Sequence, residues 1–149
     1  RRALEASVHA PEEWHLPAVR AAWADADPAW KTTAVFCMRF VRGFEEEIVA
    51  ALRYDDPDVV YEAACAAGVW GVRPAWERIR ALAVSAGTEK RTRIAAIEAV
   101  AAIRPDEAEG LLTEIDAGDD EEVAAAVDEA LAMAGGGWTG DGLDDDDEQ

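Results

Sequence analysis

The chain has 149 residues, of which half are hydrophobic, and a formal net charge of −18. This length is enough for one folded domain with its own core. The negative charge opposes binding to nucleic-acid phosphate and to anionic membranes, and it favours basic partners or simple solubility. Two cysteines are too few for a disulfide framework, no apolar run reaches membrane-spanning length, and no signal peptide is visible. We therefore expect a cytoplasmic protein with reduced thiols.

A helical pattern recurs along the chain. Asp27-Pro28 returns as Asp56-Pro57, and Asp120-Glu121 stands in a similar place, each ahead of an Ala-rich stretch. The stretches align in four columns at i, i+4, i+7 and i+8, which is one face of an α-helix. The columns are Trp30, Val59, Thr92 and Val123; Ala34, Ala63, Ala96 and Val127; Cys37, Ala66, Ala99 and Ala130; and Met38, Ala67, Val100 and Leu131. This internal repeat predicts a stack of helical units.

A second helical stretch follows each first one. One of its columns contains Val19, Ile48, Trp76 and Leu112. The local residues support the boundaries, because aspartate caps helix N-termini, proline is tolerated at the first helical position, and glycine is favoured at helix ends. The glycines expected at or near helix ends are Gly43, Gly68, Gly71 and Gly87. A single helical hairpin cannot cover both of its apolar faces, so we expect the units to stack on one another.

The domain organisation follows from these boundaries. We expect a helical array over residues 1–134, made of a partial unit at 1–26, complete units at 27–55, 56–87 and 88–119, and a capping helix at 120–134. The Gly-rich and then acidic segment 135–149 is predicted to be disordered. Residues 139–149 hold six of the 32 acidic residues, and without them the chain still carries −12. Acidity is therefore a property of the folded part as well.

The repeat carries a family resemblance. Residues 56–68 (DPDVVYEAACAAG) resemble the first helix of a HEAT repeat, of the short bacterial kind named after phycobilisome lyases, and residues 72–76 (VRPAW) resemble its second helix. The resemblance covers roughly residues 16–134. It implies an all-α fold, a right-handed α-solenoid of antiparallel helix pairs with about four repeats, in a bacterial or archaeal protein. The arginine that usually follows the first-column valine in this family is Val60 here, and it is present as Arg93 in the next unit.

Two other helical arrays are alternatives. The units look too short for armadillo repeats, and the aromatic and glycine pattern of tetratricopeptide repeats is missing. The HEAT-type array is therefore the preferred interpretation.

The residues that could carry chemistry have structural interpretations. His9 and His15 lie six apart without a helical ligand spacing, so we interpret them as surface histidines rather than metal ligands. Cys37, Trp30 and Trp76 fall in core columns, and we expect them to pack in the interior. Aspartate pairs at the repeat turns have a capping role. We therefore expect no catalytic residue, no metal and no cofactor.

The predicted binding surface is on the second helices, which line the concave face in solenoids of this kind. Removing the core positions leaves a set that we call the second-helix ridge: Arg20, Trp23, Glu45, Val49, Arg73, Glu77, Arg80, Glu109, Thr113 and Asp116. The ridge mixes both charges with apolar surface, which suits a protein or peptide better than a nucleic acid. Trp138, alone in the acidic tail, is a further candidate as part of a short binding motif, and the favoured alternative is a purely solubilising tail.

These features favour a non-catalytic interaction or scaffold module that binds a protein partner, with no nucleic acid or membrane involved. One alternative is an acidic inhibitor or immunity-type protein for a basic partner. The resemblance also allows a lyase-type enzyme subunit. A HEAT-like DNA glycosylase is a weaker alternative, because the charge of −18 opposes it.

Overall fold

The computed structural model describes residues 1–135. These residues form nine α-helices and one 3-10 helix, with no strand among them, so the expected all-helical class is confirmed. The elements are α1 (Arg2–Ser7), α2 (His15–Ala24), α3 (Pro28–Cys37), α4 (Glu45–Ala51), α5 (Pro57–Trp70), η1 (Arg73–Ala75), α6 (Trp76–Val84), α7 (Lys90–Ile103), α8 (Pro105–Thr113) and α9 (Glu121–Gly135). Gly135, placed in the tail by the sequence, instead ends α9. Trp138 and the rest of the predicted tail lie outside the described residues.

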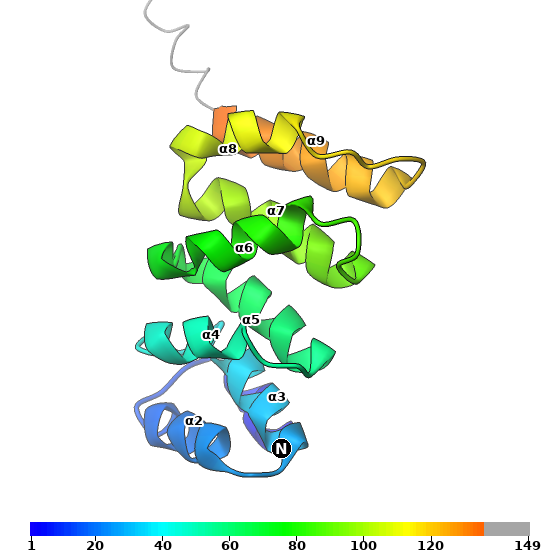
Figure 1. Ribbon diagram of the computed structural model, residues 1–149. Coiled ribbons are helices and arrows are strands. Elements are labelled where there is room, and N and C mark those ends of the chain that lie inside the picture. Colours follow the sequence, from blue (N-terminus) through cyan, green and yellow to red (C-terminus); the bar gives the residue numbers. More distant parts are fainter. Residues whose placement is uncertain (136–149) are drawn as a thin grey trace, which may run out of the picture.

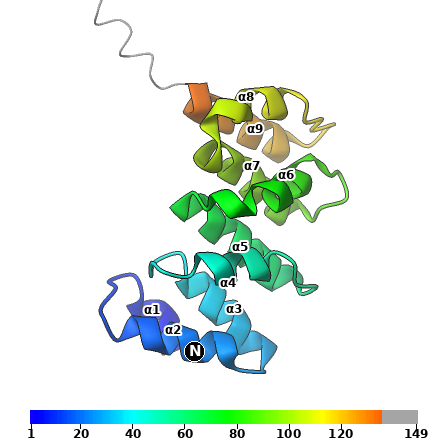
Figure 2. The ribbon, with the colours of Figure 1, turned by 60° about the vertical axis from the view of Figure 1, so that its left-hand side comes forward.

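The helices lie in two layers that run along the molecule (Figures 1 and 2). In the odd layer, α3, α5, α7 and α9 pack against one another in succession, and α1 packs on α3 at one end. In the even layer, α2, α4, α6 and α8 each pack on the odd-numbered helix that follows in the chain. Neighbouring helices of the even layer make few contacts with each other. The odd layer therefore connects one helix pair to the next.

The predicted N-caps are present. Asp27 accepts a hydrogen bond from the backbone N of Ala29 at 2.9 Å, and Asp56 accepts one from Asp58 N at 2.9 Å. A proline follows each of these aspartates at the first helical position, where the missing N–H costs nothing. The side chain of Asp120 accepts from two backbone N–H groups at the start of α9. The Asp-Pro and Asp-Glu signals therefore mark true helix starts.

The four predicted columns form the core. Fourteen of their sixteen residues are buried, and the other two, Trp30 and Leu131, are half-buried and pack against the core. Gly68 lies in the last turn of α5, near the helix end as expected, whereas the cap itself is Gly71. A Cβ atom at Gly68 would lie 3.2 Å from the Cα of Ala99 on α7. Because glycine has no side chain, the backbones of α5 and α7 can lie in close contact here.

Cationic side chains close the ends of even-layer helices. Lys31 Nζ donates to the carbonyl O of Trp23 at 2.6 Å, in the last turn of α2. The buried Arg93 donates its Nε to the carbonyl O of Ala83 at 2.9 Å, in the last turn of α6. The last carbonyl groups of a helix have no partner inside the helix and carry partial negative charge, so a cation is stabilising there.

In the intervening pair, α4 and α5, a different residue donates to the carbonyl group at the end of the even-layer helix. Lys31 and Arg93 share one register position, directly after the first core column, and the equivalent position in α5 is Val60, which has no side-chain donor. Here Arg78 of α6 donates its Nε to the carbonyl O of Leu52 at 3.0 Å, at the end of α4. The side-chain donor missing at Val60 is therefore replaced from another helix.

The close approach of α5 and α7 predicts opposite effects for two glycines. Gly68→Ala gains about 1 kcal/mol of helix propensity, but overpacking against the Ala99 backbone costs about 1–3 kcal/mol, so we expect a net loss of stability. Gly110→Ala in α8 meets no atom within 4 Å and is expected to stabilise by up to about 1 kcal/mol. Urea unfolding of both variants measures these changes. A Gly68→Ala variant as stable as Gly110→Ala would show that the α5–α7 contact is loose.

The buried arginine predicts a stability loss. Arg93→Met keeps the aliphatic stem but leaves the carbonyl of Ala83 without its donor, and we expect a loss of about 1.5–3 kcal/mol in the free energy of unfolding. Arg91→Met is the control, because Arg91 is exposed and pairs with Asp58 and Glu89 at the surface, where such pairs are worth about 0–1 kcal/mol. Equal losses in the two variants would contradict the structural role of Arg93.

Candidate functional site

The second-helix ridge belongs to the even layer. Eight of its ten residues are exposed, whereas Trp23 and Val49 are half-buried and pack against the core. Arg73 lies on η1 and Asp116 in the turn after α8. Four even-layer helices thus contribute exposed polar side chains to this layer, and its two apolar members mainly serve packing.

Contacts join the ridge at its N-terminal part. Arg20 of α2 pairs with Glu47 of α4 at 3.9 Å, and its guanidinium lies 5.2 Å from the ring centre of Phe44. A polar depression of about 430 Å³ adjoins them, lined by Arg20, Arg42, Gly43, Glu45, Glu46 and Glu47. These charged groups are solvated and exchange partners at small cost, since exposed ion pairs contribute little. This part of the ridge can therefore contact acidic or basic groups.

The C-terminal part of the ridge is acidic. Glu109 and Thr113 are exposed on α8. The carboxylate of Asp116 accepts from the backbone N of Gly118 at 2.8 Å, which fixes the turn before α9. Asp116 is therefore a structural residue of this turn as well as a ridge residue.

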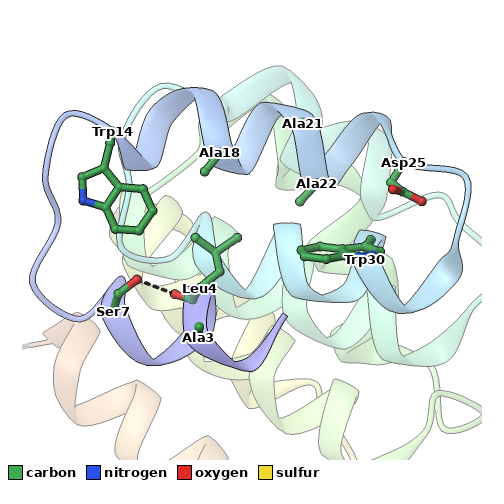
Figure 3. A pocket seen from close by; sticks show the side chains of 9 residues that line it. All are labelled: Ala3, Leu4, Ser7, Trp14, Ala18, Ala21, Ala22, Asp25 and Trp30. Atoms are coloured by element: carbon green, nitrogen blue, oxygen red, sulfur yellow. Dashed lines mark hydrogen bonds between the residues drawn. The ribbon is translucent and has the colours of Figure 1, made fainter.

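An apolar groove lies between α1 and α2, at the N-terminal end of the stack (Figure 3). Its volume is about 580 Å³, within the usual range for ligand pockets. It is lined by Ala3, Leu4, Ser7, Trp14, Ala18, Ala21, Ala22, Asp25 and Trp30. Trp14 stands at one end, and Asp25 and Trp30 stand at the other. Asp25 is the one charged residue of this lining, so the α1/α2 groove presents mostly carbon to solvent.

Sequence reasoning did not find the α1/α2 groove. Trp30 was assigned to the core, and it does pack against the core, but it also lines the groove. Trp14, at the other end of the groove, has an exposed fraction of 49%. Trp76 is buried, as expected. The available signal was the stripe of small residues Ala18, Ala21 and Ala22 on one face of α2, which leaves room beside them.

A buried histidine holds Trp14 at the groove. His15 was interpreted as a surface residue, and this was wrong, because only 1% of it is exposed. Its Nδ1 accepts from the backbone N of Glu12 at 2.8 Å, and its Nε2 lies 3.0 Å from Ser7 Oγ on α1. The indole of Trp14 stacks on the imidazole with ring centres 3.8 Å apart. These bonds tie the start of α2 to α1.

A second cavity, of about 330 Å³, opens on the odd layer. Its polar lining includes Arg39, Cys65 and Glu98. Burial raises the pKa of the Cys65 thiol, and it raises the pKa of the buried Cys37 thiol to about 12. A nucleophilic cysteine needs a lowered pKa, so neither thiol is activated. The structural interpretation of Cys37 is confirmed by its complete burial.

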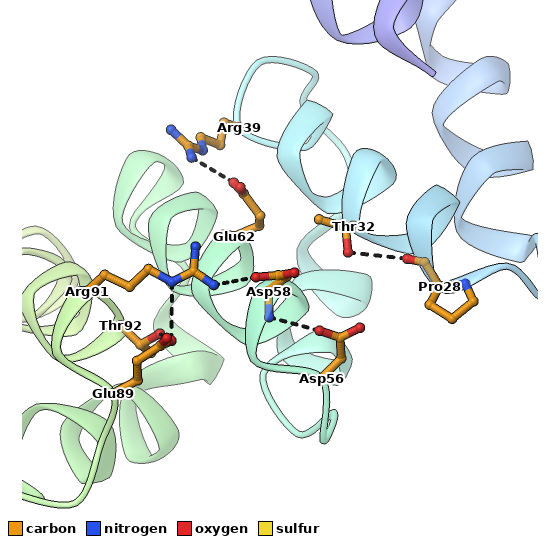
Figure 4. Close-up of polar contacts among 9 residues, drawn as sticks. All are labelled: Pro28, Thr32, Arg39, Asp56, Asp58, Glu62, Glu89, Arg91 and Thr92. Carbon is orange, nitrogen blue, oxygen red and sulfur yellow. Dashed lines mark hydrogen bonds and ion pairs between the residues drawn. The ribbon is translucent and has the colours of Figure 1, made fainter.

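Ion pairs link successive odd-layer helices, and Figure 4 shows two of them. Arg39, just after α3, bonds Glu62 of α5 at 2.7 Å, and Arg91 of α7 pairs with Asp58 of α5. Lys90 pairs with Asp120 at the start of α9 at 3.3 Å. Such pairs join the helices at the surface.

Neither a metal-binding cluster nor a membrane-spanning helix occurs in the described residues 1–135. Within residues 1–135, no group of three or more His, Cys, Asp or Glu side chains is placed to hold a metal ion. No helix in this range is long and apolar enough to cross a bilayer. No protein-family model matches the chain, and a search of curated proteins finds no significantly similar sequence. The candidate functional surfaces are therefore the ridge and the α1/α2 groove.

Glu98 in the odd-layer cavity predicts a pH effect. Glu98 is exposed overall, but partial burial of its carboxyl in this cavity, with the nearby charge of Glu129, raises its pKa. Its protonated form is therefore favoured by folding, and this contribution to stability is lost as the pH rises through the raised pKa. We expect Glu98→Gln to raise the melting temperature at pH 7, with the difference shrinking below about pH 4, near the unfolded pKa of a glutamate.

The exposed Glu109→Gln variant controls for the general effect of removing one negative charge. Melting curves of both variants between acid and neutral pH, at moderate salt, measure the difference. A gain for Glu98→Gln that equals the control, or that persists in acid, would contradict the local effect.

Proposed function

We propose that this protein is a HEAT-like α-solenoid and a non-catalytic interaction module that binds a protein partner across the second-helix ridge. The observation that carries the proposal is the even layer. Its four helices each pack on an odd-layer helix, make few contacts with one another, and contribute six of the eight exposed ridge residues. A partner that spans these helices can contact several of them at once, as extended solenoid surfaces allow. In this proposal the module acts in the cytoplasm and binds no nucleic acid.

The charge distribution supports a basic partner near α8 and α9. Residues 104–135 contain eleven acidic residues and one basic residue, whereas residues 1–53 contain eight acidic and seven basic residues. A field of this kind steers basic surfaces toward the C-terminal end of the stack. The same observation favours a second candidate function, an acidic inhibitor that covers the binding surface of a basic protein. Trp138 would belong to either interface.

Site-specific photo-crosslinking in the native host tests the ridge. A photoreactive amino acid at position 77 or 113 of the full-length protein is expected to give a discrete adduct with one partner, identified by mass spectrometry. Position 69, exposed on α5 of the odd layer, serves as the control and should give no such adduct.

A charge reversal provides the quantitative step. Glu109 is exposed on α8, and Glu109→Lys is expected to weaken binding of the captured basic partner at least about tenfold, as like-charge contacts oppose association. Equal adducts from positions 77 and 69, or an unchanged affinity for the variant, would count against the ridge. Inhibition of the partner's own activity would select the second candidate function.

A further inference from the structure

The α1/α2 groove lies at a position that an even-layer helix occupies beside the other odd-layer helices. In every following pair, an even-layer helix packs on the next odd-layer helix: α2 on α3, α4 on α5, α6 on α7 and α8 on α9. Helix α1 also belongs to the odd layer, since it packs on α3. Within residues 1–135 no even-layer helix packs on α1 in this way. The apolar groove opens beside it.

The register of the second helices shows what the groove positions normally contact. Ala18 of α2 aligns with Glu47 of α4, whose carboxylate pairs with Arg20 of the preceding even-layer helix. Asp25 aligns with Tyr54, whose ring lies 5.5 Å from a tryptophan ring of that same preceding helix. These positions therefore face the even-layer helix before their own. In α2 they line open space instead.

Two further observations agree with this assignment. Ala21 aligns with Arg78 of α6, which donates to the carbonyl O of Leu52 at the end of the preceding even-layer helix. On α1, Leu4 and Ser7 are three residues apart, the same spacing as two of the core columns, yet both are only half-buried. Each wall of the groove thus has core-type positions without a covering helix.

We infer that the α1/α2 groove binds an amphipathic helix of another protein, in the place that an even-layer helix would take. From Trp14 to Asp25 the groove follows eleven residues of chain, or about 16 Å at 1.5 Å per residue, which is about three helical turns. Apolar side chains at i, i+3 or i+4 and i+7 fill it, as in other helix-in-groove complexes.

Charge determines the polar end of this ligand. The C-terminal ends of successive even-layer helices lie side by side, as the contact between Trp23 of α2 and Tyr54, just after α4, shows. The last turn of the bound helix therefore lies near Asp25, the charged residue of the lining. A Lys or Arg there complements this carboxylate. The inference rests on the proposed interaction function but concerns a different surface from the ridge.

The test uses the full-length protein and a synthetic amphipathic peptide of about three to four turns, capped, helix-stapled, with leucines on one face and lysines in its last turn. An isomer of the same composition, with its leucines spread around the helix, is the control peptide. NMR titration at moderate salt, where long-range attraction is screened, is expected to shift the indole N–H signals of Trp14 and Trp30. The isomer should bind at least about tenfold more weakly, because only the first peptide presents a continuous apolar face.

Two alanine variants provide the matched control. Ala21→Arg places a long cation in the groove and is expected to weaken binding at least about tenfold, since it removes the space for apolar side chains. Ala50→Arg adds the same residue at the aligned, equally exposed position of α4, outside the groove, and should leave the affinity within about twofold. Asp25→Asn should weaken the lysine-ended peptide but not a glutamine-ended one, because the loss concerns one charged contact.

Three outcomes would overturn the inference: equal binding of the isomer, unchanged binding by Ala21→Arg, or signal shifts confined to the ridge. A concentration-dependent dimer that shields Trp14 would also overturn it, by showing that a second copy covers the groove. Crosslinking from position 77 is independent of the groove, so Ala21→Arg should leave it intact. Failure of the groove and failure of the ridge proposal are thus distinguishable.

Discussion

The close packing of successive odd-layer helices is the contact on which the rest of the structure depends. At Gly68 and Ala99 the backbones of α5 and α7 approach so closely that one added Cβ would crowd them. Small residues in the core columns make this approach possible, and the interior is therefore filled with few large side chains. Because the odd layer makes most of the contacts that join successive helix pairs, the even-layer helices need little contact with each other. Their outer surface is therefore left for polar residues, which form the ridge.

The second requirement is electrostatic. Each even-layer helix ends in carbonyl groups without partners inside the helix, close to the core. Lys31 and Arg93 satisfy two of these ends from the same register position, and Arg78 satisfies the third from a different helix. What repeats along the stack is thus a donor at a place in space rather than a residue at a place in an alignment. Val60 departs from the repeat at no electrostatic cost.

The sequence predicted the features that depend on local periodicity. Four columns at helical spacing identified the buried face, and Asp-Pro pairs identified helix starts, because both depend on residues within one helix. The close contact at Gly68 was not predicted and His15 was wrongly placed at the surface, since both depend on partners on other helices: Ala99 for the glycine, and Ser7 on α1 for the histidine. The α1/α2 groove was missed for the same reason. The small face of α2 is visible in the sequence, but the space beside it exists only once α1 packs on α3.

The two ends of the described stack differ in the surface that they expose where no further helix pair packs. At α9 the outward positions are charged, with Glu121, Glu122, Asp128 and Glu129 exposed to water, so this end carries little penalty when solvated. At α1 and α2 the corresponding surface is mostly apolar. Two hydrogen bonds fix the imidazole of His15, on which the indole of Trp14 stacks at the edge of the groove. Covering an apolar surface of this size is favourable, because it removes carbon atoms from water. The asymmetry in charge and in apolar area therefore separates two contacts: basic surfaces are attracted to the α8–α9 end, and an apolar helix face fits the α1–α2 end.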